Sequence, residues 1–495
     1  MITRIKITGF KSLMNTELYL GPFTCIAGAN AIGKSNFFDA LAFLSNLADK
    51  TVVEAARSIR SENQKHSNIE DMFYRTGEDV TKTIEFEIDM LVPKEGTDDL
   101  GQTARAKITS LRYTLHLKLN GAASQREPIE IIHEALIPLT LSNARKNILF
   151  ERNSAWLDSV LMGRRSGSPF ISTKDGIIKL HADSTENKRG GRTTEFIAEK
   201  MPRTLLSTVT AESPTAFLAR QEMRDWIMLQ SEPVALRQPN SIFEVKNAEI
   251  KANGLNLPAT LFRLNAAKTG DDVFQKLTNK LIGLVEDISD ISVDNDEKRD
   301  LLTLQAHFKN GLTLPAHSLS DGTLRFLALA IIEEDNLSSR LICLEEPENG
   351  INPKKIPLMV ELLQGIATDT EFAVDDDNPL RQVIINTHSP LVVNTVPDES
   401  LYLAKEKECY SELFNKKIRY TGFSALRDTW KTNHQLAEAT SPGEIIAYLD
   451  TGRIGQATGN EFNEPKGNYR KKHKGSKSKR TVAENINQIQ LDFDY

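Results

Sequence analysis

The sequence has only three cysteines, and their spacing suggests neither a disulfide framework nor a zinc site. Cys25 and Cys343 lie in apolar runs that predict core strands, whereas Cys409 stands alone in a charged segment. Free cysteines of this kind are typical of a reducing compartment, and we therefore expect a cytoplasmic protein.

Long apolar runs are also missing. The longest, residues 326–332, is far too short to cross a bilayer, which argues against a membrane protein. The first residues alternate apolar and polar side chains and do not form the apolar core of a signal peptide, so we do not expect secretion. The sequence also shows no internal repeat and no heptad pattern long enough for a coiled-coil arm.

Neither sign of charge is in large excess, because the formal net charge is −6 over 495 residues. This balance argues against a surface that coats nucleic acid uniformly. Basic residues do gather in one arm near the end of the chain, separated by Gly and Ser: Lys466, Arg470, Lys471, Lys472, Lys474, Lys477, Lys479 and Arg480. We predict that this arm is disordered; it either contacts nucleic-acid phosphates or serves only as a solubilising linker. The apolar residues 489–495 suit a docking peptide.

The strongest pattern in the sequence is a phosphate-binding loop. An apolar run predicts a strand before it, and Asn36 begins the predicted helix after it. The loop fits G-x-x-x-x-G-K-[ST] in full: Gly28, Ala29, Asn30, Ala31, Ile32, Gly33, Lys34 and Ser35. Its backbone N–H groups and the helix N-terminus would surround a phosphate chain, Lys34 would reach the β- and γ-phosphates, and the Ser35 hydroxyl would hold Mg²⁺.

Two acidic residues follow a second apolar strand at residues 341–344. Glu345 would hold the Mg²⁺–water shell, and Glu346 would polarise the water that attacks the γ-phosphate. A pair of acids at a strand end is weak evidence alone, but it becomes strong downstream of a complete phosphate loop.

Two further positions are candidates for contact with phosphate. His388 follows the apolar strand 383–385, and ligand sites of α/β proteins lie at the edge where such strands end, so we predict a γ-phosphate contact. Ser320, Asp321 and Gly322 open a predicted helix whose N-terminus would be an anion site. From the residues alone, Ser320 could equally be a plain helix cap.

The order of these motifs resembles the ABC-type ATPase head shared by SMC, RecF and OLD-like proteins. More narrowly, residues 319–325, 345–353 and 386–390, together with 253–257, resemble RecF/OLD-like AAA ATPases of bacterial genomes. Many of those belong to anti-phage systems, such as the Septu, PARIS and retron-associated ATPases. The resemblance covers roughly residues 1–120 and 250–405.

The resemblance implies a homodimer, or a higher even-numbered oligomer, in which two protomers enclose ATP and Mg²⁺. Ser320, Asp321 and Gly322 of one protomer would reach the nucleotide held by Lys34 of the other, with Glu346 as general base. The sequence departs from the usual pattern in having Glu345 in place of Asp and Asn352 in place of His. The glutamine of the Q-loop has no clear counterpart, and Gln102 and Gln125 are the only candidates that we identify.

We therefore expect an α/β fold, a P-loop NTPase of the ABC-head type with a mixed sheet and an inserted α+β middle region. The expected division is 1–120 and 251–440 for the two halves of the head, 121–250 for the insertion, and 441–495 for the tail. Within the insertion, residues 142–202 predict a surface insertion or hairpin subdomain, with Arg-rich turns at 163–167 and 188–192, and residues 217–229 predict a helix.

The expected function is ATP hydrolysis that controls a separate effector protein, a nuclease by preference, in phage defence. This chain lacks the acidic metal-binding pattern that follows the His motif in OLD-type nucleases, so a partner would do the cutting. The alternative is a RecF-like DNA-repair ATPase without a toxic partner, which leaves DNA as a candidate ligand. A transporter ATPase is disfavoured because the strand-rich middle and the basic arm have no use at a membrane subunit.

Overall fold

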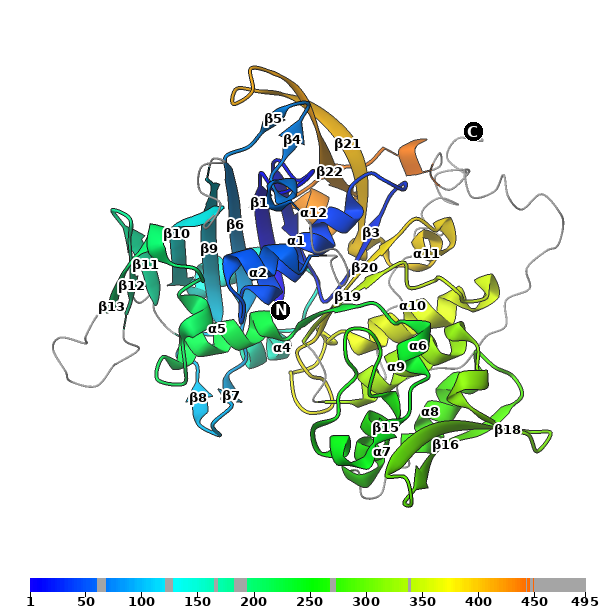
Figure 1. Cartoon of the computed structure of the whole chain (residues 1–495). Helices are drawn as coiled ribbons and strands as arrows, with labels where there is room; N and C mark the ends of the chain where they lie inside the picture. The colour runs from blue at the N-terminus through cyan, green and yellow to red at the C-terminus, as the bar shows by residue number, and fades with distance from the viewer. Residues whose placement is uncertain are drawn as a thin grey trace.

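The computed structural model contains two large sheets, with the helix that follows the phosphate loop between them, and a smaller sheet beside α7 (Leu257–Ala267) and α8 (Val273–Ile282) (Figure 1). It describes residues 1–495 except 60–67, 121–127, 164–167, 182–193, 268–272, 337–339, 442, 446–447 and 449–495.

Within the described residues, the central sheet has seven strands in the order β14-β19-β20-β3-β21-β22-β23. The strands are β14 (Trp226–Leu229), β19 (Leu341–Glu345), β20 (Gln382–Thr387), β3 (Phe23–Ala27), β21 (Leu401–Ser411), β22 (Lys416–Ala425) and β23 (Glu438–Ala439). The first five run parallel and β22 is antiparallel to β21, so the sheet is mixed. The carboxyl ends of the five parallel strands therefore meet at one edge.

Both faces of this central sheet are covered, which explains why β19 is apolar from Leu341 to Leu344 and why every residue of β3 and β20 is buried. Ile26 and Cys343 face the hydrophobic core on the side of the antiparallel sheet, whereas Cys25 and Ile342 face a second core. Helices fill that second core: α7 (Leu257–Ala267), α8 (Val273–Ile282), α9 (Asp321–Glu334), α10 (Ile356–Ile366) and α11 (Pro390–Thr395).

The largest sheet in the described residues is antiparallel and has the order β13-β12-β11-β10-β9-β6-β1-β2. Its strands are β13 (Thr194–Ile197), β12 (Ile177–Leu180), β11 (Ile171–Lys174), β10 (Ile129–Pro138), β9 (Ser110–Leu119), β6 (Thr83–Leu91), β1 (Ile2–Thr8) and β2 (Thr16–Tyr19). Buried and partly exposed residues alternate along β9, as expected for a sheet with one face against the core.

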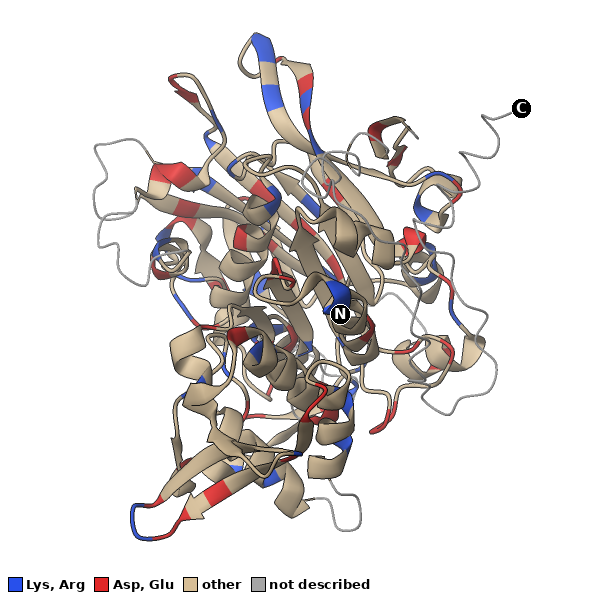
Figure 2. Ribbon diagram, turned by 90° about the vertical axis from the view of Figure 1, so that its right-hand side faces the viewer, with Lys and Arg blue, Asp and Glu red and all other residues tan. Residues whose placement is uncertain are grey.

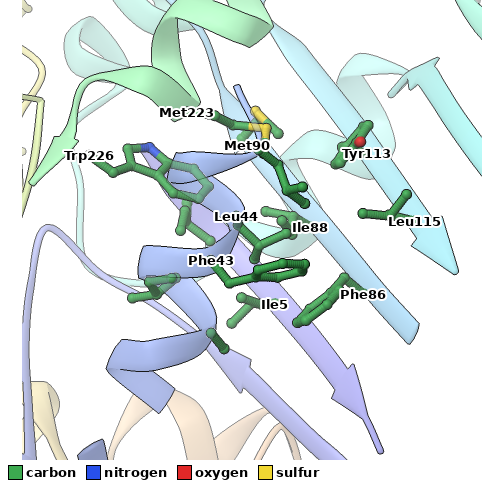
Figure 3. Close-up of a cluster of buried hydrophobic side chains, with 14 of the residues drawn as sticks. Ile5, Phe43, Leu44, Phe86, Ile88, Met90, Tyr113, Leu115, Met223 and Trp226 are labelled. Atoms are coloured by element: carbon green, nitrogen blue, oxygen red, sulfur yellow. The ribbon is translucent and has the colours of Figure 1, made fainter. Parts of the chain in front are cut away.

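Helix α1 (Lys34–Asn46) lies between the two large sheets, and its packing fixes the phosphate loop in place. Figure 3 shows Phe43 and Leu44 of α1 directed at side chains of β1 and β6. The rings of Phe43 and Phe86 are 5.8 Å apart, and both are fully buried. Aromatic burial of this size anchors the helix firmly, because each such side chain removes a large apolar area from water.

The remaining elements are smaller. A third sheet, with β16 (Ile288–Asp296), β17 (Leu301–Phe308), β15 (Asn240–Ser241) and β18 (Thr313–Pro315), packs with α7 and α8. Two hairpins are β4 (Arg75–Thr76) with β5 (Asp79–Val80), and β7 (Glu95–Thr97) with β8 (Thr103–Arg105). The other α-helices are α2 (Val52–Arg57), α3 (Leu141–Asn147), α4 (Ser154–Val160), α5 (Pro214–Arg224), α6 (Pro233–Leu236) and α12 (Trp430–Asn433).

The α/β fold with a mixed sheet agrees with the expectation from the sequence. The helix predicted for residues 217–229 is wrong in its second half, because α5 ends at Arg224 and Trp226–Leu229 is the edge strand β14. Pairing with β19 decides the conformation of this apolar run, which its periodicity could not. Residues 142–202 supply β11, β12 and β13, so part of this segment extends the antiparallel sheet. The division into domains remains a proposal.

Candidate functional site

The phosphate loop joins β3 to α1 at the carboxyl edge of the central sheet. Gly33 caps α1 with a φ of 96°, and Ala31 has a φ of 64°, so the loop curls through left-handed conformations. A Cβ atom on Gly33 would lie 2.3 Å from Oγ1 of Thr421 and 2.4 Å from Oγ of Ser12. Glycine is required here for two reasons, the backbone angle and the lack of space.

Side chains on either side hold this loop in shape. The hydroxyls of Ser12 and Thr421 are 2.6 Å apart, and Oγ1 of Thr421 donates to the carbonyl oxygen of Ile32 at 2.8 Å. Nδ2 of Asn36 donates to Oγ of Ser12 at 2.7 Å, which gives the first turn of α1 a fixed contact with the loop. Ala29, Asn30 and Ala31 at the loop tip are exposed and thus open to a ligand.

Lys34 is directed back over its own loop. Its Nζ donates to the carbonyl oxygens of Gly28 at 2.7 Å and Ala29 at 2.8 Å. Burial lowers the pKa of Lys34, and the carboxylates of Glu346 and Glu345 work against that shift. The Lys34 ammonium group therefore lies beside the loop, where the loop would surround the phosphate chain of a nucleotide.

Ser35 and Glu345 form the second part of the site. Oγ of Ser35 donates to Oε2 of Glu345 at 3.2 Å, although the two residues lie 310 positions apart in the sequence. A hydroxyl and a carboxylate facing each other are hard oxygen ligands of the type that Mg²⁺ binds alongside substrate phosphates and water. These two residues fit such an ion. In the described part of the chain, no group of three or more His, Cys, Asp or Glu side chains could hold a metal by itself.

Glu346 has an unusual backbone, with a φ of 46°. Its N–H donates to the backbone oxygen of Asn386 at 3.0 Å and to Oδ1 of the same residue at 3.2 Å, which holds the turn after β19 against the end of β20. A non-glycine residue in this region costs free energy, and such strain is concentrated at functional sites.

Two side chains contact the Glu346 carboxylate. Nδ2 of Asn349 donates to Oε2 at 2.8 Å, and Nδ1 of His388 lies 2.8 Å from Oε1. Burial raises the pKa of Glu346, but the hydrogen bonds from Asn349 and His388 outweigh it and leave the pKa below its usual value. The carboxylate is therefore ionised at neutral pH, as a general base must be.

The residues of the predicted signature segment lie at the start of α9. Oγ of Ser320 accepts a hydrogen bond from the backbone N–H of Thr323, so Ser320 is the N-cap of that helix. Arg237 forms an ion pair with Asp321, and a Cβ atom on Gly322 would lie 2.4 Å from the carbonyl oxygen of Gly350. In the part of the chain that the structure describes, the Ser320 hydroxyl bonds Thr323 and no residue of the phosphate loop.

One residue at this edge was missed from the sequence. Gln230 follows β14, which is parallel to β19, so it emerges beside the acidic pair, and one cavity of about 540 Å³ is lined by both Gln230 and Glu345. Neither earlier Q-loop candidate is placed there: Gln102 lies in the β7–β8 hairpin, and Gln125 is outside the described residues. The apolar run 226–229, bounded by a polar Gln-Ser-Glu-Pro turn, was the available signal.

A second cavity, of about 470 Å³, lies beside the phosphate loop. Gly28, Ala29 and Asn30 line one side of it, His388 another, and strands β21 and β22 with Tyr448 complete it. The loop tip and the His388 ring thus face a common space at the carboxyl edge of the sheet.

Several other predictions fall outside the described residues: most of the Arg-rich turns at 163–167 and 188–192, the basic arm from Lys466 to Arg480, and the apolar end at 489–495. Among the described residues, no helix combines the length and the apolar character that spanning a bilayer requires.

Comparisons with known proteins place this site in context. Residues 23–96 and 255–394 match the family model described as "AAA domain, putative AbiEii toxin, Type IV TA system". No curated protein sequence matches the chain.

Similar solved structures include three SMC heads. One is an SMC head bound to the C-winged helix domain of ScpA (12% identity, TM-score 0.43, 86% of this chain and 98% of that chain). Another is an Smc head domain with an extended coiled coil, bound to the C-terminal domain of ScpA, from Pyrococcus furiosus (12%, 0.41, 88% and 99%). A third is the SMC head domain from Thermotoga maritima (11%, 0.34, 86% and 99%).

The two matched segments contain the phosphate loop in one part and Ser320, Glu345, Glu346 and His388 in the other. Residues 23–96 and 255–394 are therefore similar to the AAA domain of the putative AbiEii toxins.

Proposed function

We propose that the protein binds ATP with Mg²⁺ and hydrolyses it, and that this cycle controls a separate effector protein in phage defence. One observation supports the binding and hydrolysis of ATP. Three segments far apart in the sequence bring Lys34, Ser35, Glu345, Glu346 and His388 to one edge of the sheet, with Ser35 touching Glu345 and His388 touching Glu346.

Each of these residues has a task in hydrolysis. Lys34 and the N–H groups of the loop bind and orient the phosphate chain, and Ser35 with Glu345 would hold Mg²⁺, which supplies charge neutralisation at the phosphates. Glu346 accepts a proton from the attacking water because its carboxylate is ionised. His388 lies 2.8 Å from the same carboxylate and is the residue that we propose for the γ-phosphate contact.

The test is phosphate release by the purified protein with ATP and Mg²⁺. Lys34→Ala removes the fixed positive charge of the loop and should abolish nucleotide binding. Tight ATP binding by Lys34→Ala would count against the role given to that residue.

We further propose that two copies of the chain close on ATP, with Ser320, Asp321 and Gly322 of one copy completing the site of the other. The site of one copy supports this idea, because three acidic residues of the 345–348 turn lie close enough to Lys34 to act on its charge. A triphosphate would need further donors, and the exposed start of a capped helix such as α9 offers N–H groups to an anion.

Mixing two inactive variants tests the shared site. Ser320→Arg should block closure while each copy still binds ATP, and Lys34→Ala should lose binding. In a mixture, one composite site keeps both intact faces, so partial hydrolysis should return; no return of activity would leave the shared site unsupported.

The proposal of a separate effector protein is supported by the family match and not by the geometry of the site. The matched family's description as a putative toxin of a Type IV TA system supports a protein that acts on cell growth together with a second component. Co-expression with the product of each neighbouring gene should be toxic for one of them, and Lys34→Ala should abolish that toxicity. If co-expression is toxic with none of these products and the protein binds DNA, the RecF-like alternative is favoured instead.

The same alternative makes the basic arm worth testing. Figure 2 shows acidic and basic residues interspersed over one side of the described part, and the arm lies outside the described residues. Changing its lysines and arginines to glutamine, with 481–495 kept, should weaken DNA binding and flatten its salt dependence. An unchanged salt slope would mean that the arm is only a tether.

A further inference from the structure

A third acidic side chain, Glu348, is buried next to the candidate site and has no role in the hydrolysis steps proposed above. It sits three residues after Glu345, in the turn that follows β19, and only 8% of it is exposed. One carboxylate oxygen, Oε1, accepts a short hydrogen bond from Oγ1 of Thr387. The other, Oε2, is buried and has no hydrogen-bond partner among the described residues.

Thr387 links Glu348 to two other parts of the site. Oγ1 of Thr387 also accepts a hydrogen bond from the backbone N–H of Ser389 at 2.9 Å, and this bond closes the turn that carries His388. The carbonyl oxygen of Thr387 accepts a hydrogen bond from the N–H of Gly28, the first residue of the phosphate loop, at 3.3 Å. Thr387 is fully buried, so water cannot replace these bonds.

The direction of these bonds settles where the threonine proton goes. Oγ1 of Thr387 accepts a hydrogen bond from the N–H of Ser389 and donates its single O–H to Oε1 of Glu348. The chain of contacts therefore runs from Glu348 through Thr387 to the backbone on either side of His388.

We propose that Glu348 is a positioning residue: through Thr387, it fixes the turn that holds the His388 ring against Glu346 and toward the γ-phosphate. This inference rests on the proposed ATP hydrolysis. It adds to that function a residue that acts through the side chain of Thr387.

A role in the site explains why a hydrogen-bond acceptor, and not an apolar side chain, occupies this buried position. A buried carboxylate with one oxygen unpaired costs free energy, and an apolar side chain would fill the same space at lower cost. Burial also raises the pKa of Glu348, with the Thr387 hydrogen bond opposing the shift. A neutral glutamine, which keeps an acceptor oxygen for Thr387, should therefore replace it well.

Four variants separate positioning from plain structural support. Glu348→Ala and Thr387→Val both break the chain, and kcat for ATP should fall by about 10- to 100-fold, as for other residues that orient a site through a second side chain. Glu348→Gln and Thr387→Ser keep the acceptor and the hydroxyl, and both should stay within about threefold of the wild type. ATP affinity, measured by calorimetry, should change little in all four.

A double-mutant cycle with His388→Ala gives the decisive result. If Glu348 acts through His388, adding Glu348→Ala to His388→Ala should lower kcat no further, because the residue being positioned is already absent. Multiplying losses would overturn the proposal, as would loss of activity in Glu348→Gln equal to that in Glu348→Ala. Thr387→Val is nearly isosteric, so it keeps the test valid if Glu348→Ala fails to fold.

The outcome can be told apart from failure of the proposed function. Hydrolysis by the wild type, and its loss in Glu346→Gln, test that function independently of Glu348. If the wild type hydrolyses ATP and the Glu348 and Thr387 variants match it, the positioning role alone is wrong.

Discussion

Replacing Glu346 by glutamine should stop hydrolysis while leaving the site intact. The amide has the size of the carboxylate, so the strained backbone at φ 46° and the two N–H bonds to Asn386 need not change. The amide oxygen can still accept from Asn349, and the amide nitrogen can donate to Nδ1 of His388 when the ring carries its proton on Nε2. What disappears is the negative charge that takes a proton from water.

The expected size of the effect follows from that difference. Loss of a general base typically lowers a rate by about 10²- to 10⁴-fold, which corresponds to about 2.7–5.5 kcal/mol of transition-state stabilisation. Folding stability should change by less than about 1 kcal/mol, since one acceptor is exchanged for one donor and both contacts can persist. ATP should remain bound and hold the closed dimer for longer.

The assay is single-turnover hydrolysis of ATP, with calorimetry for affinity and urea unfolding for stability. Glu371→Gln, an exposed acid away from the site, is the matched control and should hydrolyse ATP at the wild-type rate. Wild-type turnover in Glu346→Gln would refute the assignment of the base. Loss of both ATP binding and stability would show that the side chain is needed for structure instead.

Other changes test the loop, the fold and the pH response. Gly33→Ala meets both a φ of 96° and two fixed hydroxyls, so ATP affinity measured by calorimetry should fall at least about tenfold; unchanged affinity would contradict the account of the loop. Glu134 is buried and accepts N–H bonds from residues 205 and 206 on its two oxygens, so Glu134→Gln leaves one donor unpaired and should lower the free energy of unfolding by about 1–3 kcal/mol in urea; a change near zero would contradict this. Burial lowers the pKa of Lys431 to about 7, whereas the unfolded chain keeps that proton to about pH 10.4. The unfolded state therefore binds more protons between these values, and the unfolding free energy should rise with pH there. Lys431→Met should lack that contribution, and identical pH slopes in urea would be evidence against it.

Much of the candidate site could be predicted from short stretches of the sequence. The phosphate loop is a local structure, because its glycines, Lys34 and Ser35 act within one strand–loop–helix unit. The strand and the helix of that unit directly precede and follow the loop in the sequence. The acidic pair and His388 each follow a short apolar run, and parallel strands end at a common edge, so their convergence could be expected before any contact was known. The structure adds the distances, such as 3.2 Å between Ser35 and Glu345.

The position of Gln230 could not be predicted from local sequence patterns. Four apolar residues in a row are compatible with a helix or a strand, and the preceding helix α5 favoured the wrong choice. Only β19, more than 100 residues later in the chain, offers the backbone hydrogen bonds that make this run a strand. The position of Gln230 beside Glu345 follows from that pairing.

The sequence by itself determined the phosphate-loop pattern on which the proposed nucleotide chemistry rests, because such a loop depends on residue types at fixed spacing within a few turns of chain. The tertiary structure alone decided which buried polar groups support that chemistry. Glu348 and Thr387 are separated by 39 positions, and neither has a local pattern that predicts their hydrogen bond. Their contact exists because β19 and β20 are neighbours in one sheet, where burial makes each polar atom depend on a partner brought from elsewhere in the chain.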